Sequence, residues 1–117
     1  MTREFISTSV FQKCWDGLGL GDEEQRNLEG MLLDDPKVGK VIPGTGGARK
    51  VRVEYAGKGK RGGARVIYVD ILVHETIFFL IAYSKGMHEN ISESDKKTIS
   101  SLISRLKDDM DKEREVE

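Results

Sequence analysis

The chain has 117 residues, 38% of them hydrophobic and 33% charged, with a formal net charge of −1. This size and composition predict a single folded domain over residues 1–117, and they exclude a disordered chain. The one cysteine, Cys14, excludes a disulfide framework and a cysteine-based zinc site.

The N-terminal residues lack the apolar segment and the small-residue cleavage site of a signal peptide. The most apolar region, residues 71–83, contains His74 and Glu75 and is too short to span a bilayer. We therefore expect a cytoplasmic protein without a membrane partner.

The first predicted elements are a short strand at residues 4–7 and a helix after it. Ser9 followed by Gln12 is typical of a capping box. The apolar residues that follow have helical spacing, and they are Phe11, Cys14, Trp15 and Leu18. The helix ends in the glycine-containing residues 17–21, and we expect Cys14 to be a buried core residue.

A second helix is predicted to start at Asp22, which Gln25 follows three residues later. Its buried stripe consists of Leu28, Met31 and Leu32, and Pro36 follows its end. The two helices form a helical hairpin. Residues 37–47 contain four glycines and one proline, so they are predicted to be a loop that leads to a sheet.

The positive charge is concentrated next to this loop. Residues 37–65 hold nine basic residues and one acid, a local charge of +8, whereas residues 1–36 have a charge of −5. A near-neutral total therefore hides a polarised molecule, and the local patch decides which partners bind. A merely solvated charged loop is the alternative. The interleaving of the cations with glycines and strand residues favours a binding surface.

Residues 50–55 alternate between apolar and charged positions. This pattern predicts a half-buried antiparallel strand with Lys50 and Arg52 side by side on its open face. A turn at residues 56–63 follows. Residues 65–72 and 76–83 are then β-rich runs around a turn at residues 74–75, which predicts a meander of three strands.

The last predicted element is a long helix. Ser92 with Asp95 forms a capping box at its start. Its apolar stripe consists of Ile99, Leu102, Ile103, Leu106 and Met110. The charged residues 107–117 are expected to fray. The order β-α-α-β-β-β-α predicts an α+β fold, with the helical hairpin and the C-terminal helix packed on a small, mainly antiparallel sheet.

Several common catalytic motifs are absent from the sequence. Lys58 and Lys60 each follow a glycine, but no Ser or Thr comes after them, so they do not form a P-loop. His74 and His88 have no acids at metal-ligand spacing, so we expect neither a metal site nor another cofactor.

A cluster of cations remains, and antiparallel strands can bring it together on one surface. Its members are Lys50 and Arg52 from one strand, Arg65 from the next, and Lys85 after the last. Such a cluster can bind phosphates and stabilise a phosphorane, and a lysine among arginines can act as a general base. The residues alone predict an RNA-binding surface with a capacity for nuclease activity.

Three glycine-rich or basic segments, residues 44–53, 57–68 and 81–92, resemble the RelE/HigB superfamily of bacterial toxins, and within it the HigB-type branch. The resemblance implies a RelE-like fold and a toxin of a type II toxin–antitoxin system. Such a toxin is a ribosome-dependent endoribonuclease, an mRNA interferase. It inhibits translation by cutting messenger RNA without metal, through attack of the substrate 2′-hydroxyl on the adjacent phosphate.

The resemblance also implies residue roles and partners. The catalytic residues would be Lys50, Arg52, Arg65 and Lys85. The RNA-binding residues would be Arg49, Lys58, Lys60, Arg61 and His88. The partners would be messenger RNA, the ribosome and a cognate antitoxin that wraps the protein and covers its basic face. Operator DNA would be contacted only through the antitoxin.

The sequence departs from the family pattern at two places. Gly86 and Ser92 stand near positions where relatives often carry an arginine and a tyrosine, so the group that stacks on the base or supplies the acid stays open. His88 is one candidate, because it titrates near neutrality, and a plain surface histidine is the alternative.

Two other functions stay open. One is a ParE-like toxin that poisons DNA gyrase, and the other is a non-enzymatic RNA-binding module. A gyrase poison needs no phosphate-cleaving cluster, so the combination of Lys50, Arg52 and Arg65 speaks against the first.

Overall fold

The computed structural model describes residues 2–54, 63–84 and 91–116. The elements are β1 (Glu4–Ser7), α1 (Ser9–Gly17), α2 (Asp22–Asp34), β2 (Lys40–Val41), β3 (Arg49–Val53), β4 (Ala64–Ile71), the 3₁₀ turn η1 (Leu72–His74), β5 (Thr76–Ser84) and α3 (Glu93–Val116). Within these ranges the strands form one mixed sheet of five, in the order β1-β5-β4-β3-β2. Only β1 is parallel to its neighbour, β5, and the other pairs are antiparallel. The predicted α+β class is confirmed.

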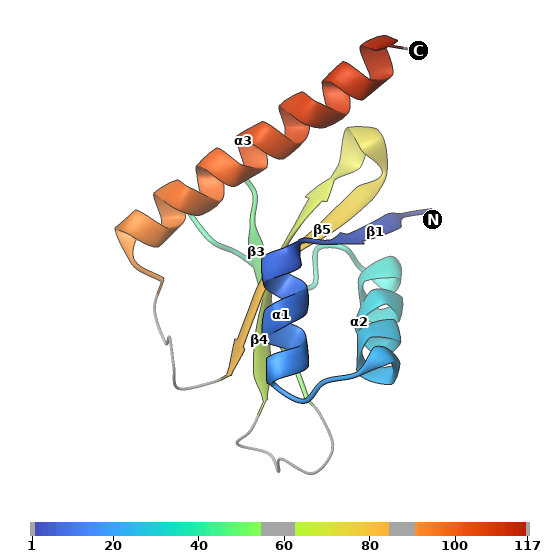
Figure 1. The fold of residues 1–117 in the computed structure, drawn as a ribbon, viewed down its shortest axis with the longest axis vertical. Helices are drawn as coiled ribbons and strands as arrows, with labels where there is room; N and C mark the ends of the chain where they lie inside the picture. The colour runs from blue at the N-terminus through green and yellow to red at the C-terminus, as the bar shows by residue number, and fades with distance from the viewer. Residues whose placement is uncertain (1, 55–62, 85–90, 117) are drawn as a thin grey trace.

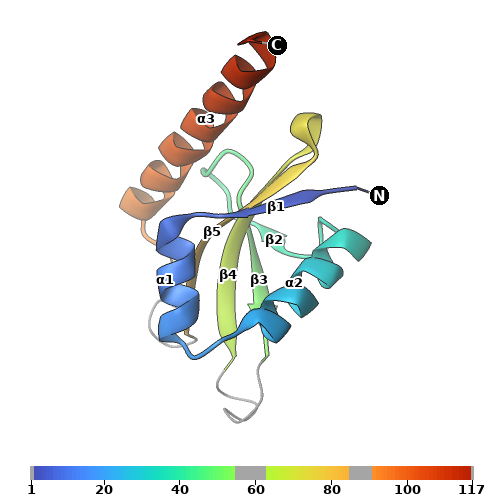
Figure 2. The same ribbon diagram turned by 45° about the vertical axis from the view of Figure 1, so that its right-hand side comes forward.

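The helices cover opposite faces of the sheet (Figures 1 and 2). Alternate residues of the central strands β4 and β5 therefore enter two separate cores. On one face, Tyr68 and Phe79 pack with Phe11 and Trp15 of α1 and with Leu28 of α2. On the other face, the residues packed beneath α3 include Ile67, Val69, Phe78 and Leu80. Most residues of β5 are therefore buried on both faces of the sheet.

A β-bulge in β5 changes which residues face each helix layer. Ile67 pairs with Ile81 whereas Tyr68 pairs with Phe79, so Leu80 is the extra residue. Leu80 and Ile81 consequently both belong to the α3 side. Because of the bulge, Ala82 lies on the face covered by α1 and α2, which we call the hairpin side, and Tyr83 lies on the face covered by α3. Strict alternation along the sequence would have placed these two residues on the opposite faces.

Both helix starts of the hairpin differ from the predicted ones. The N-cap of α1 is Thr8, whose Oγ1 accepts a hydrogen bond of 3.0 Å from the backbone N–H of Phe11. The N-cap of α2 is Gly21, whose N–H donates to Oε1 of Glu24 at 2.7 Å. Thr8 takes the cap because its hydroxyl also donates to the carbonyl of Leu80, which ties α1 to the sheet.

The predicted loop at residues 37–47 contains the short strand β2. Lys40 pairs with Lys50, and Val41 pairs with Arg49. The prediction of loop throughout was wrong, because two residues between glycine-rich segments carry too little pattern to show a strand. The bounds of β3 also differ from the predicted ones, since the strand runs over Arg49–Val53 instead of residues 50–55.

The glycines after β2 build a compact connection against α3. Thr45 is fully buried, and its hydroxyl donates to the carbonyl of Ile42 at 2.6 Å and accepts from the N–H of Ala48 at 3.1 Å. Gly44 and Gly46 both have φ of 82°, in the left-handed region that favours glycine. A β-carbon at Gly44 would lie 3.8 Å from Cδ of Lys96, so this connection lies beside the first turns of α3.

The remaining boundaries lie within one residue of the predicted ones. Strand β4 starts at Ala64, β5 extends to Ser84, and η1 with the left-handed Glu75 forms the predicted turn. Ser92 caps α3 as predicted, because its Oγ accepts a hydrogen bond from the N–H of Asp95. The helix continues to Val116, and fraying of its end stays a prediction. No helix in the described ranges is both long and apolar enough to cross a membrane.

Candidate functional site

Four cations form two directly opposed pairs on the α3 side of the sheet. Lys40 of β2 lies opposite Lys50 of β3, and Arg52 of β3 lies opposite Arg65 of β4. Opposed residues share a face, as do residues two apart on one strand. Lys50 is also opposite Ile67, whose side chain packs beneath α3, and this identifies the face. We call these four residues the cation cluster.

The opposed positions of these cations are unfavourable for the stability of the sheet. Like charges directly opposite each other destabilise a sheet, and here two such pairs are adjacent. Among the residues that the structure describes, no acid lies within ion-pair distance of Lys40, Lys50 or Arg65. Arg52 lies 3.8 Å from Glu54, but both side chains are exposed, and such a pair contributes little. The arrangement is suited to an anion that comes from outside.

The cluster borders a hollow of about 480 Å³ at the edge of the sheet. All four cations line it, together with the apolar side chains of Met31 from α2 and Val38. Lys40 and Arg52 are exposed, and Lys50 and Arg65 are partly buried. This first hollow therefore combines a cationic wall with an apolar one, which suits a phosphate that carries a sugar and a base.

Gly63 sets how closely the two arginines approach the strand end. A β-carbon there would lie 3.3 Å from Nε of Arg52, 3.3 Å from the carbonyl of Val53 and 3.7 Å from Nη1 of Arg65. A β-carbon would therefore crowd Arg52 and the carbonyl of Val53, whereas its distance to Arg65 is an ordinary contact. The sequence predicts this glycine only as part of the turn at residues 56–63, because its role depends on the pairing of β3 with β4.

Arg49 lies away from the cluster, although the sequence grouped it with the RNA-binding residues. It is opposite Tyr68, on the hairpin side of the sheet. Its guanidinium donates to the carbonyls of Gly39 at 2.7 Å and Lys37 at 3.2 Å. These bonds hold the segment that enters β2, so Arg49 has a structural role here.

Tyr68 holds the same segment from the core. Its hydroxyl donates to the carbonyl of Pro36 at 2.7 Å and accepts from the N–H of Gly39 at 3.0 Å. A β-carbon at Gly39 would lie 2.9 Å from this hydroxyl, so only glycine fits. Burial raises the pKa of Tyr68, and the hydrogen bond from Gly39 and the charge of Arg49 act in the opposite direction.

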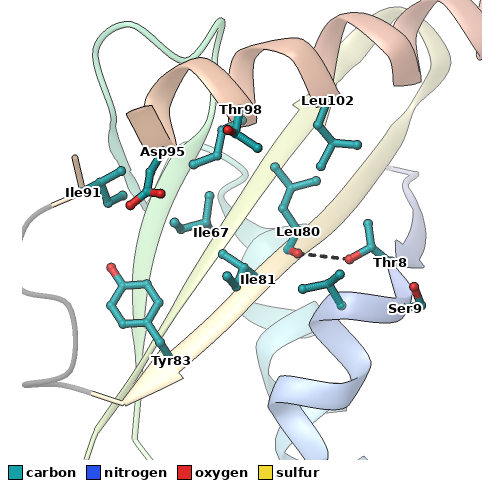
Figure 3. A pocket seen from close by; sticks show the side chains of 12 residues that line it. Thr8, Ser9, Ile67, Leu80, Ile81, Tyr83, Ile91, Asp95, Thr98 and Leu102 are labelled. Carbon is teal, nitrogen blue, oxygen red and sulfur yellow. Dashed lines mark hydrogen bonds between the residues drawn. The ribbon is translucent and has the colours of Figure 1, made fainter. Parts of the chain in front are cut away.

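Tyr83 is the neighbour of the cluster that sequence reasoning did not select. It lies opposite Arg65 across β4 and β5. Burial raises the pKa of its hydroxyl, while the charge of Arg65 lowers it. Tyr83 lines a cavity of about 490 Å³ beneath α3, at the end that also holds Ile91 and Asp95 (Figure 3). Strict alternation along β5 predicts the opposite face for Tyr83, and the bulge moves its side chain to the α3 side.

Several predicted site residues lie outside the described ranges. They are Lys58, Lys60, Arg61, Lys85 and His88. Their roles stay predictions. In the described part of the chain, no three His, Cys, Asp or Glu side chains gather into a group that could hold a metal ion.

Comparison with known proteins places these features in context. Residues 41–115 match the family described as RelE toxin of the RelE/RelB toxin–antitoxin system. A double mutant of the Escherichia coli toxin RelE in the free state is similar in structure, with a TM-score of 0.57 and 19% identity over 83% of this chain and 98% of that one. The isolated E. coli RelE toxin gives a TM-score of 0.56 and 16% identity, over 90% and 99% of the two chains. At these identities the two structures support the fold alone.

Proposed function

The chain belongs to the RelE toxin family of toxin–antitoxin systems, and from this premise we propose that it is a ribosome-dependent endoribonuclease that cuts messenger RNA and so inhibits translation. The observation that carries the proposal is the cation cluster. Lys50, Arg52 and Arg65 share one face of the sheet, where Lys50 lies opposite Lys40 and Arg52 lies opposite Arg65. The assignment to the HigB-type branch and to the cytoplasm belongs to the same proposal.

In the proposed reaction the substrate supplies its own nucleophile. The ribose 2′-oxygen forms a bond to the adjacent phosphorus, and the bond from phosphorus to the 5′-oxygen of the next nucleotide breaks. The 2′-hydroxyl proton leaves to a base, and a proton is delivered to the departing 5′-oxygen. The products are a 2′,3′-cyclic phosphate and a 5′-hydroxyl. Negative charge builds up on the phosphate oxygens, and nearby cations stabilise it.

The residues take roles according to their positions. Arg52 of β3 and Arg65 of β4 lie opposite each other, so both can hold the oxygens of one phosphate. Lys50 lies two residues along β3 and is the candidate for the base. Lys85 is proposed as a fourth catalytic cation, and Lys58, Lys60, Arg61 and His88 as RNA contacts. A cognate antitoxin is proposed to cover this face, and operator DNA is reached only through it.

The test is cleavage of messenger RNA on ribosomes in the presence of a chelator. Lys50→Ala combined with Arg52→Ala should abolish the cleavage products. A matched control, Lys97→Ala with Arg105→Ala, removes the same charge from exposed positions of α3. Intact message with the unmodified protein would contradict the proposal.

Two further measurements distinguish the alternatives. RNA binding that falls steeply with salt, without cleavage products, would indicate a non-enzymatic RNA-binding module. DNA damage on expression, without loss of messenger RNA, would indicate a gyrase poison.

A further inference from the structure

A second hollow lies beside the first and shares two of its cations. It has a volume of about 450 Å³, and Lys40, Lys50 and Lys96 line it together with Ile42, Pro43 and Ile91. Lys40 and Lys50 also line the first hollow. The two hollows therefore share the opposed pair of Lys40 and Lys50. Together their cations form a row that runs from Arg65 on β4 to Lys96 on α3.

Lys96 approaches this hollow from an electrostatically unfavourable position. It lies four residues after the N-cap Ser92, near the positive end of the α3 dipole. Glu93 offsets part of this cost, since its Oε1 lies 3.2 Å from Nζ of Lys96, but Glu93 is 85% exposed. The aliphatic part of the Lys96 side chain lies beside Gly44, in the connection that follows β2. The side chain therefore extends towards β2. An anion in the hollow would relieve the repulsion among Lys40, Lys50 and Lys96.

We propose that the second hollow binds the neighbouring phosphate of the same single-stranded RNA, with Lys40 and Lys96 as its ligands and Lys50 shared between the two sites. This inference rests on the proposed function, because it extends the site where cleavage would occur. Ile42, Pro43 and Ile91 provide an apolar wall for the attached nucleoside.

The spacing of the cations agrees with this arrangement. Lys50 and Arg52 are two positions apart on β3, which corresponds to about 6.8 Å at the usual rise of a strand. Successive phosphates of an extended strand are separated by a distance of the same order. One opposed pair can therefore hold the phosphate that is cut, while the other pair with Lys96 holds the next one.

The experiment uses 2′-O-methyl RNA, which the protein cannot cut, as a dinucleotide with one phosphate and as a pentanucleotide. Binding to the full chain is measured as salt rises. For single strands each lost phosphate contact flattens the slope of log affinity against log salt by about 0.7. Lys96→Gln should show this loss with the pentanucleotide and leave dinucleotide binding unchanged. Lys40→Gln should show the same loss with the pentanucleotide and should also weaken the dinucleotide, because Lys40 lines both hollows. Lys97→Gln is the matched control, since it removes a charge from the next, exposed position of α3.

Three outcomes would overturn the inference. The variants Lys40→Gln and Lys96→Gln could bind the pentanucleotide with the same slope as Lys97→Gln. Lys96→Gln could weaken the dinucleotide as much as the pentanucleotide, which would place Lys96 in the first site. Both variants could also keep oligonucleotide binding and lose only binding to ribosomes, which would assign the two lysines to ribosomal RNA. Ribosome-dependent cleavage by the unmodified protein is scored separately, so failure of the proposed function is distinguishable from failure of this site.

Discussion

Arg52 and Arg65 lie directly opposite each other on β3 and β4, with Gly63 beside both guanidinium groups. A sheet gains nothing from two opposed arginines, and it loses stability through their repulsion. This pair is therefore expected to lower the stability of the fold while it supports the proposed activity. Substitutions here should change the two properties in opposite directions, which is a signature that a purely structural residue would not give.

Arg65→Gln should stabilise the fold by up to about 1 kcal/mol, because it removes the repulsion with Arg52. The same change should lower ribosome-dependent cleavage by about a hundredfold or more, because one charge-stabilising group is lost. Urea unfolding and a cleavage assay give the two values. Arg105→Gln, at an exposed position of α3, should leave both unchanged. Loss of stability together with activity would mean that Arg65 supports the fold.

Gly63→Ala should reduce cleavage while the chain still folds. The new β-carbon would lie 3.3 Å from Nε of Arg52, so the guanidinium must move from its position in the cluster. The matched control is Gly30→Ala, since a β-carbon at this helical glycine meets nothing within 4 Å. That change should raise the stability by about 0.5–1 kcal/mol and leave cleavage intact. Full activity of Gly63→Ala would remove Gly63 from the site.

Asp111→Ala should loosen the last turns of α3. Nε2 of His74, in η1, lies 2.8 Å from Oδ1 of Asp111, and this contact joins the end of the helix to the corner between β4 and β5. Hydrogen exchange should accelerate in residues 107–113 and stay the same in the first turns. Asp108→Ala, at an exposed position of the same helix, is the control. Equal exchange in both variants would show that His74 does not hold the helix.

The stability of the fold should decline at alkaline pH. Burial raises the pKa of Tyr68 and Tyr83 above the ordinary value of 10.0, because the neutral hydroxyl is favoured in the core. The folded chain then binds these protons more tightly than the unfolded chain does. The resulting stability is present below pH 10.0 and is lost as the pH rises through the folded values.

Urea midpoints measured across this range test the effect. Tyr83→Phe should show a shallower decline than the unmodified protein, since one of the two ionisations is removed. An identical decline in the two proteins would mean that Tyr83 does not contribute. Tyr68→Phe is a poorer test, because it also removes the hydrogen bonds to Pro36 and Gly39.

Much of the architecture follows from local patterns in the sequence. The helical stripes of α1, α2 and α3 and the β-rich runs of β4 and β5 need only periodicity to be found, because each element buries one face or both. The same period of two puts Lys50 and Arg52 on one face of β3 whatever their partners are. That part of the candidate site could be predicted from the sequence.

The rest depends on contacts between distant residues. The caps Thr8 and Gly21 could not be chosen locally, since Ser9 and Asp22 are equally good capping residues and the bond of Thr8 to Leu80 decides the first case. The alternation along β3 puts Arg49 on the face of Val51, away from Lys50 and Arg52. Its pairing with Tyr68 agrees with this. Its hydrogen bonds to the carbonyls of Gly39 and Lys37 could not be predicted from its neighbours in sequence.

Local patterns in the sequence are enough to predict an α+β fold and a strand with two cations on one face. Periodicity and charge are properties of neighbouring residues, and they survive in any tertiary arrangement. Four features of the site depend on the packing of the whole chain. They are the choice of which cations oppose one another, the pairing of Lys40 with Lys50, the position of Gly63 beside Arg52, and the bulge that turns Tyr83 towards α3. Strand register sets all of these, and register is the outcome of the whole core packing at once.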